Sequence, residues 1–337
     1  EIAMSDWSSD VCSSDLASLP YAKRNLSLQP KRATTKTMSK FINPFTDYGF
    51  KLIFGREVSK DLLIEFLNDL LEGERVITDL TFLNNEQLPD YPEGRGIIYD
   101  VYCTTDTGEK IIVEMQNRMQ SNFKERSIFY LSRAIVNQGR TGHDWKFEIK
   151  AVYGVFLMNF IMDKNIKLRT DVILADKETG ELFSEKFRQI FIALPLFKKS
   201  EEECETNFER WIYILNNMET LKRLPFKARK AVFEKLEEIA DVASMSPKER
   251  ELYDNSVKVY RDYLVTMDAA EKEGIKKGMK EGMKEGLKKG LEEGLKKGRE
   301  EALNIFQTAI DMKKQGIDNQ LIAEKTGLPL SLIESLK

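Results

Sequence analysis

Two short apolar runs around a turn constrain the fold of this chain more than any other feature. The runs are Gly96–Thr104 (GIIYDVYCT) and Lys110–Gln116 (KIIVEMQ), and a turn at Asp106–Gly108 lies between them. Because successive strand residues point to opposite faces, apolar residues on both faces predict central strands with a layer on each side. A three-residue loop with Gly108 in a left-handed conformation would join them as a hairpin. The chain is therefore expected to fold as α/β around this hairpin.

The same hairpin brings polar side chains into an apolar setting. In this register Asp100 lies opposite Glu114, and Glu114 shares a face with Gln116. A register shifted by one residue would make the two acids diagonal neighbours instead. The pair is either part of a solvated polar face or a site for a divalent cation. The apolar surroundings favour the cation, because a buried charge must be paired or bind a metal.

Residue usage excludes most other catalytic chemistry. His143 is the single histidine, which excludes His-rich zinc sites and argues against Ser-His or Cys-His catalysis. No Walker-type phosphate loop is present. Carboxylates, amides and lysines remain, and these suit an oxygen-binding cation such as Mg²⁺. The cysteines, Cys12, Cys103 and Cys204, lack metal-ligand spacing and favour a reducing, cytoplasmic setting. No apolar run approaches the ~20 residues that span a bilayer, so no membrane partner is expected.

Residues 1–37 differ in character from the rest. Met4–Leu16 repeats Ser and Asp without apolar periodicity, and it lacks the core of a signal peptide. Met38 is interpreted as the start, which makes 1–37 a non-native or disordered leader. With the basic stretch Lys23–Lys40 discounted in this way, a net charge of −3 argues against broad, nonspecific coating of DNA.

From residue 38 the pattern becomes globular. The predicted core, 38–200, has the order helix, three strands, helix, strand, which indicates a mixed sheet. Ser59 is expected to cap the second helix, whose apolar stripe includes Leu62 and Phe66, and Asn122 with Glu125 is expected to form a capping box. The elements expected in order are a helix within Asn43–Phe54, a helix after Ser59, a strand at Val76–Leu83, the hairpin, a helix from Asn122 to Gly139, a strand at Phe147–Phe160, and a second hairpin from Leu168–Leu174 and Leu182–Leu194 that extends or covers the sheet.

The remainder of the chain is predicted to be helical. A helical cap is expected at 201–270. In 271–302 a glycine recurs every fourth residue from Gly274 to Gly298, and each repeat turns the stripe by ~40°. Seven interior glycines cost about 7 kcal/mol relative to Ala, so this segment is either a solvated, marginal helical linker or a helix ordered by packing against its own copy. The last part, 303–337, resembles a helix-turn-helix around Gly327; with few cations it could equally be two short packed helices.

Four segments resemble one known family. They are Phe45–Phe54 (FTDYGFKLIF), the strand that holds Asp100, Val113–Gln116 (VEMQ) and Glu125–Tyr130 (ERSIFY). From about Phe41 to Ala270 the chain resembles the Rpn family of recombination-promoting nucleases, also labelled transposases, within the PD-(D/E)XK superfamily. The resemblance implies a restriction-endonuclease-like core with the order of elements described above and a C-terminal helical region.

The resemblance also implies roles for individual residues. Asp100 and Glu114 would be the two acids that hold Mg²⁺ or another divalent cation, with the Met115 carbonyl as a third ligand and Glu65 as a first-helix acid. Gln116 stands where the superfamily usually has Lys, and it would position the attacking water. On the following helix, a face made by Arg126, Tyr130 and Arg133 would hold the DNA backbone, the alternative being a solvated polar face.

The expected function is that of a Mg²⁺-dependent DNA endonuclease linked to recombination or mobile elements. The alternative is a catalytically weak DNA-binding or partner-recruiting protein of the same fold. In either case the repeat helix is the surface expected to form a homo-oligomer.

Overall fold

The computed structural model describes residues 39–88, 95–140, 142, 145–226 and 231–336. The expected leader 1–37, with Cys12, and the histidine His143 lie outside the described residues.

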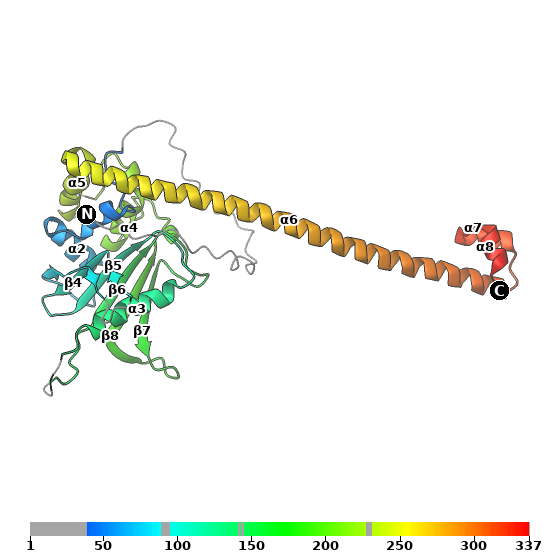
Figure 1. The fold of residues 1–337 in the computed structure, drawn as a ribbon, viewed down its shortest axis with the longest axis horizontal. Helices are drawn as coiled ribbons and strands as arrows, with labels where there is room; N and C mark the ends of the chain where they lie inside the picture. The colour runs from blue at the N-terminus through cyan, green and yellow to red at the C-terminus, as the bar shows by residue number, and fades with distance from the viewer. Residues whose placement is uncertain (1–38, 89–94, 141, 143–144, 227–230, 337) are drawn as a thin grey trace. The chain divides into compact units, whose positions relative to one another are not determined.

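A six-stranded mixed sheet forms the centre of the fold (Figure 1), with strand order β1-β4-β5-β6-β8-β7. The strands are β1 (Leu80–Phe82), β4 (Val101–Thr105), β5 (Lys110–Gln116), β6 (Val152–Met158), β7 (Arg169–Ala175) and β8 (Leu182–Ala193). Neighbours pair antiparallel except for β5 with β6 and β6 with β8, which are parallel. The predicted order of helix, three strands, helix and strand is confirmed, and the second hairpin extends the sheet because β8 pairs with β6.

The central hairpin has the predicted register and turn. Val101 pairs with Val113, which places the preceding Asp100 opposite Glu114. The Thr105 N–H donates to the Glu109 carbonyl at 2.9 Å, and Gly108 has a φ of 95°. A left-handed conformation costs glycine little, so the turn closes without strain.

Two helical layers cover the two faces of this sheet. Alternate residues of β5 explain the layers, since Ile111 and Val113 join one buried cluster while Ile112 joins the other. The first face is covered by α1 (Asp47–Phe54), α2 (Lys60–Leu70), α4 (Asn207–Asn217) and α5 (Val232–Ala240), and the second by α3 (Phe123–Val136). The predicted apolar stripe of α2, including Leu62 and Phe66, is buried.

Several predicted strands and caps are shorter or absent, each for a local reason. The first strand breaks before Asp100, and its early part, β3 (Ile97–Ile98), forms a separate ribbon with β2 (Glu86–Gln87). The strand expected at 76–83 is confined to β1. The Asn68 side chain accepts a hydrogen bond from the Ile77 N–H at 2.7 Å and donates one to the Ile77 carbonyl at 2.9 Å, so this backbone does not pair with a strand. The strand expected from residue 147 begins at Val152, because Phe147 has a φ of 58°.

The two predicted N-cap residues do not form the predicted hydrogen bonds. Ser59 and Asn122 occupy the cap positions of α2 and α3, but neither side chain accepts from its helix. The Ser59 hydroxyl instead donates to the Arg56 carbonyl at 3.2 Å. Asn122 has φ −102° and ψ 25°, away from the extended backbone that a capping side chain requires.

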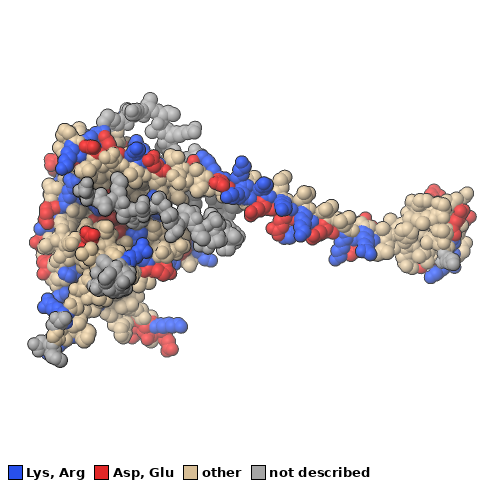
Figure 2. All heavy atoms as spheres, viewed as in Figure 1, with Lys and Arg blue, Asp and Glu red and all other residues tan. Residues whose placement is uncertain are grey.

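A single helix, α6 (Pro247–Lys314, 68 residues), runs across both expected boundaries at 270/271 and 302/303. It begins with a capping box between Ser246 and Glu249. Figure 2 shows charges of both signs along it. Two short helices, α7 (Asn319–Thr326) and α8 (Leu330–Ser335), follow, and Gly327 turns between them with a φ of 71°. No helix in the described part of the chain has both the length and the apolarity needed to cross a membrane.

Candidate active site

The Asp100 and Glu114 carboxylates are joined through each other's backbone. The Asp100 N–H donates to Glu114 Oε1 at 3.1 Å, and the Met115 N–H donates to Asp100 Oδ2 at 2.9 Å. This arrangement lies at the start of β4, where its pairing with β5 begins at Val101. Just before Val101, the Asp100 carboxylate takes the place of a strand carbonyl as the acceptor for the Met115 N–H. The second oxygen of each carboxylate, Asp100 Oδ1 and Glu114 Oε2, takes no part in these two bonds.

Burial makes ionisation of this pair costly. Glu114 is only 4% exposed. Burial raises the pKa of Asp100 to about 6, opposed in part by the hydrogen bond from Met115 and by the positive charge of Lys51. Burial, and then the charge of Asp100, raise the pKa of Glu114 well above its ordinary value. Two such carboxylates become compatible with full ionisation when a cation lies between them.

The first helix brings opposite charges to the pair. Lys51 Nζ lies 2.7 Å from Asp47 Oδ1, one turn earlier in α1. The helix is fixed at its start, since Thr46 Oγ1 accepts from the Gly49 N–H at 3.0 Å. A 2.7 Å bond from Asn117 Nδ2 to the Phe45 carbonyl ties this start to the end of β5. The site is therefore formed at the junction of α1 with the strand that carries Glu114.

Comparison with known families shows the family to which this fold belongs. Residues 44–270, more than half of the chain, match the family described as PD-(D/E)XK nuclease family transposase. The chain belongs to this family. Neither the curated proteins nor the solved structures contain a match. The family membership supports a nuclease-like function, and the matched range agrees with the expected resemblance from Phe41 to Ala270.

The other predicted site residues, Gln116, Met115 and Glu65, contribute no side chain to the two bonds that join Asp100 and Glu114. Gln116 is half-buried, and its Nε2 donates to the Arg118 carbonyl at 3.2 Å. The backbone of Met115 faces the β4 side of its strand, as does that of Glu109, because hydrogen-bonding direction alternates along a strand. Glu65 lies on α2, and the largest charge effects on the pKa of Asp100, after burial and the Met115 bond, come from Lys51 and Asp47 instead.

Sequence reasoning therefore missed Asp47 and Lys51. Both lie within the segment FTDYGFKLIF, and their spacing of four residues places them on one face of a helix. That spacing was a usable signal for a charged pair on the first helix. It could not show that this helix face approaches Asp100, because the approach depends on long-range packing.

The three residues predicted to face DNA on α3 are partly engaged within the protein. Arg126 Nε donates to the Tyr130 hydroxyl at 2.9 Å, and its Nη1 donates to Gln120 Oε1 at 3.0 Å. Arg126 also lowers the raised pKa values of both carboxylates. Arg133, two turns along the helix from Arg126, donates to the Leu88 carbonyl at 2.7 Å. Arg126 and Tyr130 thus flank the carboxylate pair, whereas Arg133 holds a neighbouring segment.

The donor set of the site fits a hard cation. Within the described ranges, no group of three or more His, Cys, Asp or Glu side chains could hold a metal ion. The Asp100 and Glu114 carboxylates offer oxygen ligands of the kind that Mg²⁺ prefers, and water would supply the other ligands of such an ion.

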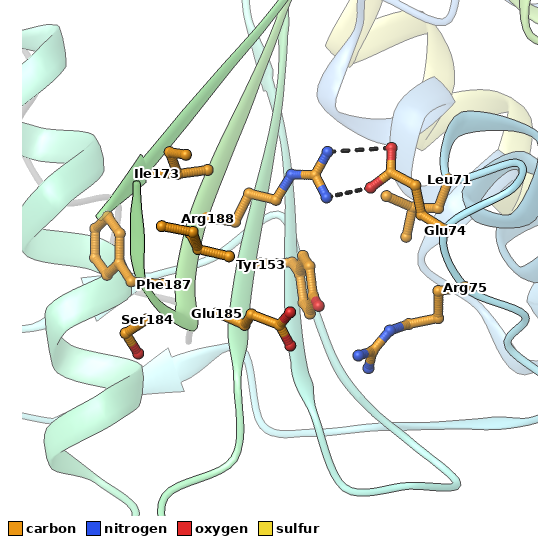
Figure 3. Close-up of a pocket in the computed structure, with 10 residues that line it drawn as sticks. Leu71, Glu74, Arg75, Tyr153, Ile173, Ser184, Glu185, Phe187 and Arg188 are labelled. Atoms are coloured by element: carbon orange, nitrogen blue, oxygen red, sulfur yellow. Dashed lines mark hydrogen bonds and ion pairs between the residues drawn. The ribbon is translucent and has the colours of Figure 1, made fainter. Parts of the chain in front are cut away.

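A hollow elsewhere in the molecule has a different character. It has a volume of about 280 Å³ and lies where the end of α2 meets β6 and β8 (Figure 3). Its two arginines pair with acids: Arg188 with Glu74, as Figure 3 shows, and Arg75 with Glu109. Because this hollow includes neither Asp100 nor Glu114, it is separate from the candidate active site.

Proposed function

We propose that the chain is a Mg²⁺-dependent DNA endonuclease that hydrolyses phosphodiester bonds in recombination or in the movement of mobile elements. The observation that carries this proposal is the pair of half-buried Asp100 and buried Glu114, each of which accepts a hydrogen bond from a backbone N–H. A reducing cytoplasmic setting belongs to the same proposal, since Cys103 and Cys204 are buried with free thiols.

Each residue of the site has a chemical task in this proposal. Asp100 and Glu114 hold the cation, with the Met115 carbonyl as a further ligand. A bound Mg²⁺ would supply Lewis-acid activation of water and neutralise charge on the phosphate. Lys51, from α1, contributes a positive charge beside the pair, and Gln116 offers an amide that can orient water but cannot neutralise charge. In this proposal Arg126 and Tyr130, on α3, contact the DNA backbone.

A plasmid-nicking assay tests the proposal directly. Supercoiled plasmid is incubated with the wild-type chain, with Asp100→Asn and with Glu114→Gln, in Mg²⁺ and in EDTA. Nicking is expected for the wild type in Mg²⁺ alone. Asp262→Asn is the matched control, because Asp262 is exposed on α6 and its replacement should leave nicking unchanged. Nicking that persists in EDTA and in both site variants would refute the assignment of the pair.

A second candidate is a catalytically weak DNA-binding or partner-recruiting protein that self-associates through α6. Two observations favour it: the motif has Gln116 in place of a cation, and six apolar side chains of the repeat are 57–80% exposed. These side chains are Ile275, Met279, Met283, Leu287, Leu291 and Leu295. Light scattering on the full chain would show a dimer or larger species that a Leu287→Glu, Leu291→Glu variant loses, whereas a monomeric wild type would contradict self-association.

A further inference from the structure

Arg118 stands out among the arginines near the active site. Its guanidinium carbon lies 4.3 Å from the centre of the Tyr263 ring on α6, and the residue is exposed. Among the described residues its guanidinium donates no hydrogen bond, whereas Arg126 and Arg133 donate to groups of the protein itself. Stacking on a ring face leaves the N–H groups at the guanidinium edge available to an external acceptor.

The ring beneath Arg118 is itself held in place. The Tyr263 hydroxyl donates to the Asn117 carbonyl at 3.2 Å. One turn earlier in α6, the Tyr260 hydroxyl accepts from Asn159 Nδ2 at 3.3 Å, and the Asn159 N–H donates to the Gln116 carbonyl at 2.9 Å. These bonds attach α6 to the ends of β5 and β6. Arg118 is therefore presented on a fixed platform, which lowers the entropy lost when it binds a ligand.

The location of this platform relates it to the reaction. Arg118 follows Gln116 by two residues and Glu114 by four, at the end of the strand that holds both. A guanidinium matches the geometry of a phosphate, and it keeps its charge at every physiological pH. We propose that Arg118, held by Tyr263, binds a backbone phosphate of the DNA next to the bond that is cut. The inference rests on the DNA substrate proposed above and adds α6 as one wall of its path.

Binding measured without cleavage tests this inference. Fluorescence anisotropy of a labelled duplex in Ca²⁺, at several salt concentrations, gives Kd and its salt dependence for the full chain. Arg118→Ala is expected to raise Kd roughly tenfold and to reduce the slope of log K against log salt by about 1. Tyr263→Leu removes the platform and should weaken binding, whereas Tyr263→Phe keeps the ring and should retain most of it.

Arg140→Ala is the matched control, since it removes an equal charge at the other end of β5. Arg140 is exposed beyond α3, near Gln138, whose side chain bonds the backbone of Lys150. Thermal melts confirm that every variant is folded. Equal Kd values for Arg118→Ala and Arg140→Ala would overturn the inference while leaving the nuclease proposal intact. Arg118-dependent binding without any cleavage would support the inference and count against the nuclease, and a wild type that binds no duplex would overturn both.

Discussion

Replacing Asp100 by Asn should make the metal-free protein more stable while it abolishes the proposed activity. Asn keeps the shape of Asp and its acceptor for the Met115 N–H, but it removes a charge held beside Glu114. Burial raises the pKa of Asp100 from 3.8 to about 6. At 1.36 kcal/mol for each pKa unit, the ionised Asp100 destabilises the fold by about 3 kcal/mol.

The sign of this effect sets its dependence on pH. A carboxyl with a raised pKa in the folded state binds its proton more tightly there, so the folded state is favoured at low pH. The contribution is fully present below about pH 4 and is lost as pH rises through about 6. The advantage of Asp100→Asn over the wild type should therefore be about 3 kcal/mol at pH 7.5 and vanish near pH 4.

Urea unfolding in EDTA, repeated between these two pH values, measures the advantage. Asp262→Asn is the control, and a change at this exposed position should stay within about 0.5 kcal/mol. Adding Mg²⁺ or Mn²⁺ should stabilise the wild type and not the variant, because the proposed cation site needs both carboxylates and exists only in the folded state. An Asp100→Asn protein that is no more stable than wild type at pH 7.5, or that gains equally from metal, would refute the reasoning.

Three further outcomes are expected. Lys51→Met should reduce nicking roughly 100-fold through loss of a charge beside the pair. Adding Gln116→Lys to the Lys51→Met variant should restore part of the nicking. No rescue would show that a positive charge at position 116 cannot replace the one at position 51. Asp47→Asn should alter the rate of nicking more than Glu65→Gln does, because Asp47 influences the pKa of Asp100. A larger effect of Glu65→Gln would instead support Glu65 as a residue of the site. Gly154→Ala should lower stability by about 1–3 kcal/mol, since the added Cβ would lie 2.5 Å from a leucine methyl of α3, and an unchanged thermal melt would count against this close packing.

The sequence was sufficient to predict the central hairpin and its acids. The alternation along Lys110–Gln116 and the turn at Gly108 are local features, so the pairing of Asp100 with Glu114 could be predicted from strand geometry, with a shift of one residue left open. The order of strands and helices also followed from local periodicity. Whether the second hairpin extended the sheet or covered it was left open, because the pairing of β8 with β6 joins residues that are distant in the sequence.

Features that depend on long-range contacts were missed. The strand break at Asp100 arises from bonds to a separate segment, since the Tyr99 N–H donates to the Asn85 carbonyl and the Asn85 side chain to the Asp100 carbonyl, both at 3.0 Å. The position of Lys51 beside the acids depends on how α1 packs on the sheet. Neither contact leaves a periodic signal in the residues that make it.

The unbroken course of α6 has a consequence for how this protein can vary. One helix joins Tyr260 and Tyr263, at the ends of β6 and β5, to a segment of four-residue units that each begin with glycine. Gaining or losing one unit would lengthen the helix by ~6 Å and rotate everything beyond it by ~40°. Changes in repeat number during replication would therefore move the C-terminal helices α7 and α8 around the axis in fixed steps, without altering any residue of the candidate active site.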